Sequence, residues 1–218
     1  MANKLCFLPD PNIFLIEKNI TFTYVKGMSF SQKQKNVVSF HNSILETFPN
    51  AKILEVSTKS LIKLGNLLSA FNLELNGKKI ECIFQSSKVF ENNVQFLNLL
   101  NVSPLEAKHF IRDNANGNIV CFRYNNVVYP TNPKSLFYDY IYISALNQNK
   151  DIGDQLMNYD IFTDIEFNEK KSINCQARAC AIYKSLRLSN KLDYYLSSID
   201  TFKKIYSSFL NNDQLTLF

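Results

Sequence analysis

The sequence is poor in glycine and lacks the loops that bind nucleotides in common folds. Only 5 of its 218 residues are glycine, and neither G-x-G-x-x-G nor G-x-x-x-x-G-K occurs. Both motifs need glycine so that backbone amides can approach a phosphate closely. Their absence excludes an ordinary Rossmann or P-loop nucleotide site. No apolar run reaches about 18 residues, so we expect no membrane-spanning helix.

Histidine is scarce, and cysteine is not paired. His41 and His109 are the only histidines, and they lie far apart in the chain. A His/Cys metal site, a Ser–His–Asp triad or a Cys–His pair has little to build on, so we expect neither a metal nor a cofactor. The five cysteines include no C-x-x-C pair and follow no recognisable signal peptide. This pattern predicts reduced thiols in a cytoplasmic protein.

Tryptophan is absent, but other bulky apolar residues are plentiful. The chain has 18 Phe and 11 Tyr, and hydrophobic residues make up 46% of it. We expect one domain over residues 1–218, with an N-terminal β extension at 1–29 and a C-terminal helix within 187–218. The net charge of +5, from 24 basic and 19 acidic residues, is compatible with a nucleic-acid or phosphate partner without establishing one.

Local signals predict more helix than strand. The capping-box pattern S-Q-K-Q at 31–34 predicts a helix to about Phe48, and S-P-L-E at 103–106 predicts another helix start. Hairpins are expected around Lys18-Asn19 and around Asn125-Asn126. Further helices are expected at 58–68, 132–146, 151–159, 172–186 and 193–210. The predicted fold class is therefore mainly α, with minor antiparallel β-hairpins.

A polar line on an otherwise apolar segment is the strongest local feature. Residues 80–90 read I-E-C-I-F-Q-S-S-K-V-F, and Glu81, Gln85 and Lys88 are spaced i, i+4, i+7. At about 100° per residue, the three would share one face of a helix. A buried carboxylate and a buried ammonium are costly unless they are paired or used, so the pattern predicts a polar cavity against this face. The alternative is an amphipathic helix with both charges in water.

Five motifs, in order along the chain, resemble those of one family. They are L-S-A-F at 68–71, E-x-x-x-Q-x-x-K at 81–88, S-P-x-E-A-K at 103–108, D-x-x-F at 164–167 and S-I-N-C-Q-A-R at 172–178. The set resembles the NADAR proteins, the YbiA-like superfamily, over about residues 30–186. Runs such as Q-K-Q-K at 32–35 resemble most closely the NADAR antitoxins encoded beside DarT-type DNA ADP-ribosyltransferases. Phe167 and Tyr129 stand where a Trp is expected.

The resemblance implies a single-domain YbiA-like helical fold and an enzyme that cleaves N-glycosidic bonds. In the antitoxin branch, the reaction removes ADP-ribose from guanine bases in DNA and so reverses a DarT-type toxin. The implied partners are ADP-ribosylated DNA, expected to be single-stranded, the ADP-ribose product and a functionally linked toxin. Two alternatives stay open: an N-glycosidase of small ribosylated metabolites of the riboflavin pathway, and a non-catalytic module that binds ADP-ribose or sequesters the toxin.

The resemblance also implies three catalytic residues. Glu81 is expected to act as acid or base, with a salt bridge to Lys88 as the alternative. Lys88 is expected either to attack an opened ribose as an amine or to position charge. Asp164 is expected to orient a ribose hydroxyl or activate water, with a capping role as the alternative.

The expected ligand-binding residues surround these three. Asn174, Gln176 and Arg178 lie near a predicted helix N-terminus, which suits a pyrophosphate. The others are Ser69, Phe71, Gln85, Tyr129 and Phe167, which are expected to contact ribose or a base. Lysines also recur along two predicted helices and predict a DNA-facing surface, with solvated helix faces as the alternative; they are Lys33, Lys35, Lys59 and Lys63.

Overall fold

Strands from many parts of the chain pair to form sheets. The computed structural model describes residues 1–169, 172–207 and 209. It is 47% helical and 18% strand, with two four-stranded sheets and one two-stranded ladder. The fold is therefore mixed α/β, and the expected mainly α fold with minor hairpins is wrong. Several strands are only two or three residues long, which is too short for an alternating apolar pattern to stand out in the sequence.

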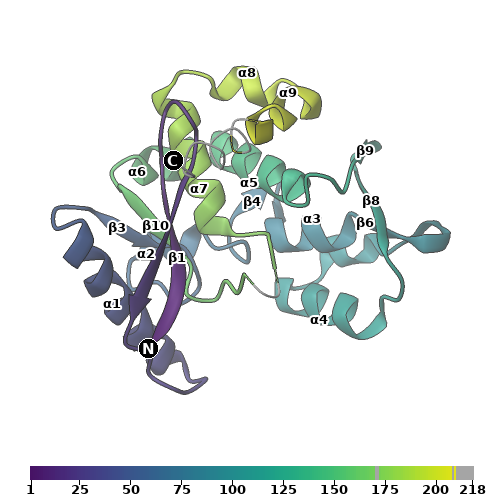
Figure 1. The fold of residues 1–218 in the computed structure, drawn as a ribbon. Coiled ribbons are helices and arrows are strands. Elements are labelled where there is room, and N and C mark those ends of the chain that lie inside the picture. The colour runs from purple at the N-terminus through teal and green to yellow at the C-terminus, as the bar shows by residue number, and fades with distance from the viewer. Residues whose placement is uncertain (170–171, 208, 210–218) are drawn as a thin grey trace.

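The first sheet has the strand order β2-β1-β10-β3 (Figure 1). Its strands are β1 (Ala2–Leu8), β2 (Ile16–Phe22), β10 (Ile161–Thr163) and β3 (Ile53–Glu55). β1 is antiparallel to β2 and β10, whereas β10 and β3 are parallel, with Thr163 opposite Glu55. The N-terminal strands thus continue a sheet whose other strands come from residues 53–55 and 161–163.

The turn between β1 and β2 is not where the sequence pattern placed it. Asp10 Oδ1 accepts hydrogen bonds from the N–H groups of Asn12 and Ile13, at 2.8 and 3.0 Å. Lys18 and Asn19 instead lie inside β2. The expected hairpin within residues 13–25 is therefore wrong, because this β-branched and aromatic run forms one strand whose partner is β1.

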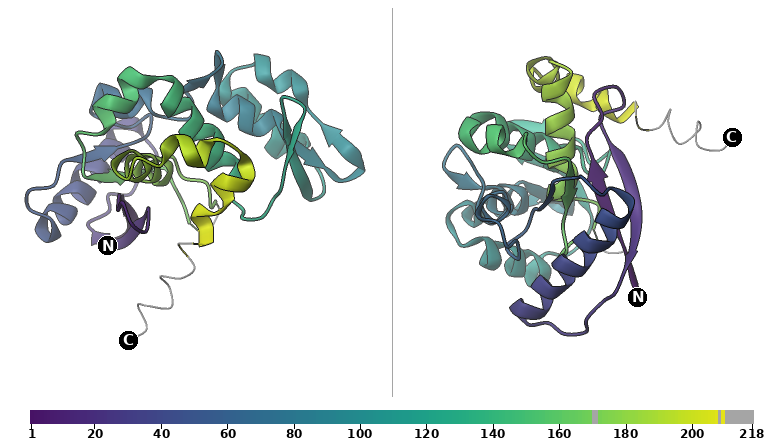
Figure 2. Two further views of the ribbon diagram at one scale, coloured as in Figure 1. Left: turned by 90° about the horizontal axis from the view of Figure 1, so that it is seen from above. Right: turned by 90° about the vertical axis from the view of Figure 1, so that its left-hand side faces the viewer.

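Helix α1 (Phe30–Thr47) covers this sheet. Figure 2 shows α1 running beside the N-terminal strands, and its Phe40 packs with Phe22 and Ile161 in a buried cluster. Its N-cap is Ser29, whose hydroxyl accepts from Gln32 N–H at 3.3 Å. The predicted capping box at 31–34 therefore lies about two residues too late, although the helix itself is confirmed.

The second sheet is antiparallel and has the order β7-β6-β8-β9. Its strands are β7 (Val94–Gln95), β6 (Lys88–Phe90), β8 (Ile119–Tyr124) and β9 (Val127–Tyr129). Asn125 and Asn126 form the tight turn between β8 and β9 with φ values of 49° and 62°. Asparagine tolerates this left-handed conformation, so the expected hairpin is confirmed. A separate ladder joins β4 (Glu74–Leu75) to β5 (Lys78–Lys79).

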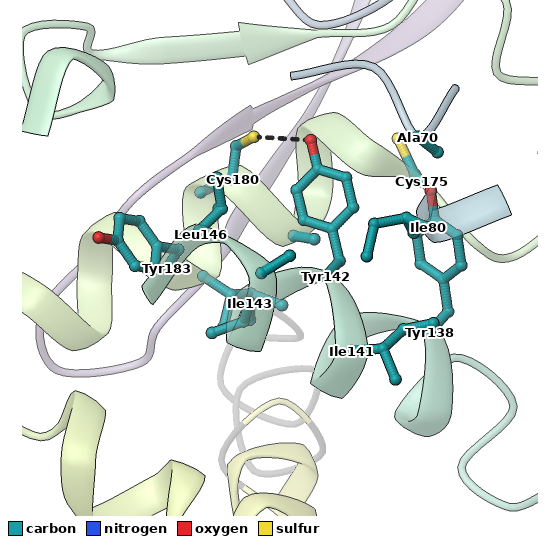
Figure 3. Close-up of a cluster of buried hydrophobic side chains, with 14 of the residues drawn as sticks. Ala70, Ile80, Tyr138, Ile141, Tyr142, Ile143, Leu146, Cys175, Cys180 and Tyr183 are labelled. Atoms are coloured by element: carbon teal, nitrogen blue, oxygen red, sulfur yellow. Dashed lines mark hydrogen bonds between the residues drawn. The ribbon is translucent and has the colours of Figure 1, made fainter. Parts of the chain in front are cut away.

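Two helices, α5 (Leu136–Gln148) and α7 (Gln176–Leu188), form the centre of the main core. Figure 3 shows Tyr142 of α5 directed at Cys180 of α7, with 3.5 Å between the hydroxyl oxygen and Sγ. All five cysteines are free thiols. The remaining helical segments of the middle region are α2 (Lys63–Leu67), α3 (Ile80–Ser86), α4 (Pro104–Asn114), α6 (Lys150–Leu156) and the 3-10 turns Glu91–Asn93 and Leu97–Asn101.

The C-terminal region is less regular than expected. Beyond α7, the described residues form the short helices α8 (Leu192–Leu196) and α9 (Ile199–Lys203) and are helical again at 205–207 and 209, in place of one unbroken helix over 193–210. The last part of the expected C-terminal helix, at 208 and 210–218, lies outside the described residues. No helix in the described part of the chain is long and apolar enough to span a bilayer.

Candidate active site

A cleft of about 1170 Å³ is lined both by residues that follow β10 and by residues of β6 and β8 in the second sheet. In Figure 1 the chain between β10 and α7 crosses the space between the first sheet and helices α3 and α4. The cleft is lined by residues 57–59, by residues 69–71, by side chains of α3 and α4, and by residues between 164 and 176. Segments that lie far apart in the sequence therefore face one cavity.

Glu81, Gln85 and Lys88 form a hydrogen-bonded chain on one wall of this cleft. Lys88 Nζ donates to Gln85 Oε1 at 2.6 Å, and Gln85 Nε2 donates to Glu81 Oε1 at 2.8 Å. The expected helix over 80–90 is too long, because α3 ends at Ser86 and Lys88 begins β6 opposite Phe122. The three residues thus share a wall of the cleft without sharing a helix.

The surroundings of Lys88 favour its neutral amine. Burial lowers the pKa of Lys88 to about 8, because an ammonium loses solvation there, while the charge of Glu81 raises it and that of Lys108 lowers it. The amine nitrogen lies 4.8 Å from the centre of the Phe84 ring. Phe84 stacks in turn on Phe122, with 5.5 Å between ring centres. Lys88, which the Gln85 amide links to Glu81, therefore lies against an apolar pair of rings.

Asp164 is a second carboxylate in the cleft, at the end of β10. Its Oδ1 accepts from the N–H groups of Glu166 and Phe167 at 3.0 and 3.2 Å, so it does cap a turn. Burial first, and then the charge of Glu55, raise the pKa of Asp164 to about 7. The charges of Glu81 and Asp164 both reach the buried hydroxyl of Tyr138, which also lines the cleft. The two carboxylates therefore belong to one electrostatic site.

Glu55 fixes the strand end that presents Asp164. Its carboxylate accepts from Ser57 Oγ at 2.6 Å, Thr163 Oγ1 at 2.7 Å and Ile165 N–H at 2.8 Å. The last two donors flank Asp164 in the chain. Burial raises the pKa of Glu55, and these hydrogen bonds lower it. The position of Asp164 thus rests on contacts on both sides of it.

The wall formed by the loop before α3 and the start of α7 has unsatisfied polar atoms. Ser69 Oγ and Asn174 Oδ1 are buried and have no hydrogen-bond partner within the described chain. Gln176 Oε1 accepts from Ala70 N–H at 2.7 Å and joins the two segments. A buried polar atom without a partner is costly, and a ligand in the cleft would supply that partner.

Two phenylalanines of the predicted set also line the cleft. Lys108 Nζ lies 5.7 Å from the centre of the Phe71 ring. Phe167 packs edge-on against Phe7 with 6.2 Å between ring centres, and its carbonyl accepts from Lys4 Nζ. Both rings are only partly buried, so each leaves surface on which a base can stack.

Two predicted ligand-binding residues lie outside the cleft. Tyr129 is buried against Phe137, with 4.9 Å between ring centres. Arg178 forms an ion pair with the fully buried Asp139 and lines a separate pocket of about 380 Å³. Their expected roles in ligand binding stay predictions, and their positions do not support a contact in the cleft.

The four lysines of the expected DNA-facing surface do not act together. Lys59 lines the cleft, whereas Lys33 forms a 2.7 Å ion pair with Glu166, and Lys35 and Lys63 lie outside it. The cleft contains instead five residues that the motif comparison did not mark as site residues: Lys108, His109, Arg112, Lys134 and Tyr138. Lys108 was visible as the last residue of the S-P-x-E-A-K motif. The others carry no signal in the sequence, because only the fold brings them together.

The arrangement offers acid–base groups, an amine nucleophile and open hydrogen-bonding positions in one cavity. Among the described residues, no group of three or more His, Cys, Asp or Glu side chains is placed to hold a metal ion. The sequence model of the DarT1-associated NADAR antitoxins matches residues 2–215 of the chain. No curated protein matches it significantly.

Proposed function

Because the chain belongs to the DarT1-associated NADAR antitoxin family, we propose that it removes ADP-ribose from guanine bases in DNA and so reverses a DarT-type toxin. The observation that carries the proposal is the hydrogen-bonded chain of Glu81, Gln85 and Lys88 on the wall of a large cleft. The volume of about 1170 Å³ exceeds the roughly 300–1,000 Å³ of ordinary small-molecule pockets. This size favours ADP-ribose attached to a base over a small ribosylated metabolite.

Cleavage of an N-glycosidic bond develops positive charge at the anomeric carbon of the ribose and negative charge on the leaving nitrogen. Glu81 is the proposed acid, which gives a proton to the departing guanine nitrogen. Its contact with the Gln85 amide fixes the direction of the carboxyl group. Asp164 is the proposed group for a ribose hydroxyl or for the attacking water, since it lies in the same cleft on the opposite segment.

Lys88 is the proposed nucleophile. Its neutral amine attacks the anomeric carbon, the carbon–nitrogen bond to guanine breaks, and guanine leaves with the proton from Glu81. The lysine nitrogen then gives a proton to the Glu81 carboxylate, and opening of the ribose ring converts the adduct into an imine. Water then hydrolyses the lysine adduct and releases ADP-ribose, so no oxidant or other reactant is needed. A lysine whose pKa lies near 8 has a useful fraction of free amine at neutral pH.

The open polar atoms and the rings suggest where the ligand is held. Ser69 Oγ and Asn174 Oδ1 lack partners within the described chain and are the proposed contacts to ribose or pyrophosphate oxygens and hydroxyls. Phe71 and Phe167 are the proposed stacking surfaces. Gln176 is assigned to holding the Asn174 segment against the Phe71 loop, because its side-chain oxygen is already bonded to Ala70.

The test is release of ADP-ribose from an oligonucleotide that is ADP-ribosylated on guanine. The parent protein and Glu106→Gln, an exposed carboxylate on α4 outside the cleft, should restore the unmodified oligonucleotide, as measured by mass spectrometry. Glu81→Gln should slow release by roughly 10²- to 10⁴-fold, because it removes the proton donor and keeps the shape. Release by Glu81→Gln at the parent rate would contradict the assignment of Glu81.

The same assay separates the alternatives. An N-glycosidase of small metabolites would turn over free ribosylated pyrimidines faster than modified DNA. A binding module would bind ADP-ribose and neutralise the toxin without releasing anything. Either result would overturn the proposed activity while leaving family membership intact.

A further inference from the structure

Helix α4 directs all its cleft-facing charges to one side. Leu105, Lys108, His109 and Arg112 are spaced i, i+3, i+4, i+7, and all four are exposed and line the cleft. This spacing puts them on a single helix face. The two acidic side chains of α4, Glu106 and Asp113, do not line the cleft.

Packing fixes the direction of this face. Ala107 and Ile111, on the other side of α4, are buried against Cys82 of α3 in one apolar cluster. Ser103 Oγ accepts from Glu106 N–H at 3.2 Å and caps the helix at its first turn. The helix therefore cannot rotate its basic face away from the cleft without exposing that cluster.

The charges on this face are available to a ligand. Among the described residues, Lys108 and His109 form no ion pair, and Arg112 pairs only with its exposed neighbour Asp113. The segment after β10 contributes Glu166 and Glu169 to the same cleft. Glu166 is already paired with Lys33, whereas the cleft-lining charges of α4 are all basic, so an extended anion is drawn to the α4 side.

The basic face also begins at the reacting residues. The charge of Lys108 lowers the pKa of Lys88, and the amine of Lys108 lies over the Phe71 ring. From there Arg112 is four residues along α4, a rise of about 6 Å. A chain of phosphates leaving the reaction centre along this helix would meet cations in sequence, with Phe71 and Leu105 as surfaces for bases.

We propose that Lys108, His109 and Arg112 of α4 bind the phosphodiester backbone beside the modified guanine in single-stranded DNA. This inference rests on the proposed function and assigns the residues that hold the strand beside the modified base. The reacting side chains are largely buried, so a guanine reaches them only when it is out of a base-paired stack. A polynucleotide strand supplies the repeated phosphates that a row of exposed cations requires.

The test uses the double variant Lys108→Gln/Arg112→Gln with two substrates. One is the ADP-ribosylated oligonucleotide, and the other is ADP-ribosylated guanosine, which carries the pyrophosphate but no strand. We expect the KM for the oligonucleotide to rise roughly tenfold. The slope of log KM against log salt concentration should become shallower by about 1.4, or 0.7 for each lost phosphate contact. Turnover of the guanosine substrate, measured above the pKa of Lys88 so that its amine is neutral in the parent and in the variant, should change less than about twofold.

The matched control is Lys150→Gln/Lys203→Gln, which makes the same change in net charge at exposed positions on α6 and α9. It should leave both substrates unchanged. Equal loss on both substrates would overturn the proposal, because the cations would then serve the ADP-ribose itself. No loss on either substrate, or faster turnover of duplex than of single-stranded DNA, would also overturn it.

A failure of the proposed activity is separable from a failure of the strand site. If the parent releases ADP-ribose from neither substrate, the activity is wrong. Binding of unmodified single-stranded DNA, measured by fluorescence anisotropy with the same variants, then tests the strand site alone. Loss of binding in the α4 double variant but not in the control would support the site, and equal binding would reject it.

Discussion

Two clusters of buried cations, around Lys88 and around Arg178, differ in how the cation meets its carboxylate. Arg178 contacts Asp139 directly, and that contact, with Tyr206, raises its pKa although burial alone would lower it. Lys88 is separated from Glu81 by the Gln85 amide, and burial lowers its pKa to about 8. A direct ion pair locks a charge in place, whereas an interposed amide keeps the carboxylate aligned and leaves the amine free to lose its proton.

This comparison predicts that substitutions in the two clusters have different effects on activity and on stability. Changes at the Lys88 cluster should abolish chemistry and spare the fold. Changes at the Arg178 cluster should weaken the fold and spare the chemistry, because Arg178 lies outside the cleft.

The largest expected effect is at Lys88. Lys88→Met removes both the nucleophile and the charge, and Lys88→Arg removes only the nucleophile. If the amine attacks the ribose, both variants lose activity by on the order of 10³-fold or more in single-turnover release of ADP-ribose. Activity of Lys88→Arg within tenfold of the parent would instead assign Lys88 to electrostatic stabilisation.

Reductive trapping of the covalent intermediate distinguishes a nucleophilic Lys88 from one that only stabilises charge. Borohydride added during turnover should fix a covalent ADP-ribose adduct on Lys88 in the parent, visible by mass spectrometry of the peptide. Lys150→Met, at an exposed lysine of α6, is the matched control and should retain both the activity and the adduct. An adduct on another residue, or none in active enzyme, would contradict the assignment.

The next largest effect is on stability at Arg178. Arg178→Met leaves Asp139 fully buried without its cation, which costs roughly 3–5 kcal/mol of unfolding free energy. The double change Arg178→Met/Asp139→Asn should recover much of that loss in urea titrations. The rate of ADP-ribose release per folded molecule should stay near the parent value. A selective loss of activity with unchanged stability would restore Arg178 as a ligand-binding residue.

The sequence was sufficient for the parts of the site that are local. Ser103 and Pro104 predict the start of α4, and Asn125-Asn126 predicts a hairpin turn, because caps and tight turns depend on a few neighbouring residues. Nine of the eleven predicted site residues line the cleft, and all nine lie in the motifs at 68–71, 81–88, 164–167 and 172–178. Phe71 and Gln85 are examples in which the motif carried the information.

The parts that failed depend on long-range pairing. Lys88 was placed on a helix because its spacing fits one, but pairing of residues 88–90 with β8 takes it into a strand. Strand β10, Ile161–Thr163, is only three residues long and pairs with β3, more than 100 residues away, which no local pattern records. Arg178 was assigned from its place near a helix start, and its ion pair with Asp139 is visible only in the fold; its role in ligand binding stays a prediction.

The pH dependence tests the same contrast with a smaller effect. Lys88 must be neutral to attack and Glu81 must hold the proton that it gives. The plot of the logarithm of the single-turnover rate against pH should therefore bend downward by about one unit of slope, at a limb near the Lys88 pKa of about 8. Removing the positive charge of Lys108 with Lys108→Gln should raise the pKa of Lys88 and move this limb to higher pH. A limb that stays in place would mean that another group controls the rate.

The smallest expected effect concerns Asn174 and Gln176, two neighbouring residues that line the cleft near the start of α7. Asn174 Oδ1 has no partner in the described chain, so Asn174→Ala should raise the KM by roughly five- to tenfold, or about 1 kcal/mol, without lowering the melting temperature. Gln176 already accepts from the buried Ala70 N–H, so Gln176→Ala should cost about 1–3 kcal/mol of stability by leaving that donor unsatisfied. If polar atoms without a protein partner bind the ligand and paired ones stabilise the fold, Asn174→Ala changes the KM alone and Gln176→Ala lowers the melting temperature. The same pattern in both variants would mean that this wall does not distinguish the two roles, and that the contrast between Lys88 and Arg178 does not extend to uncharged groups.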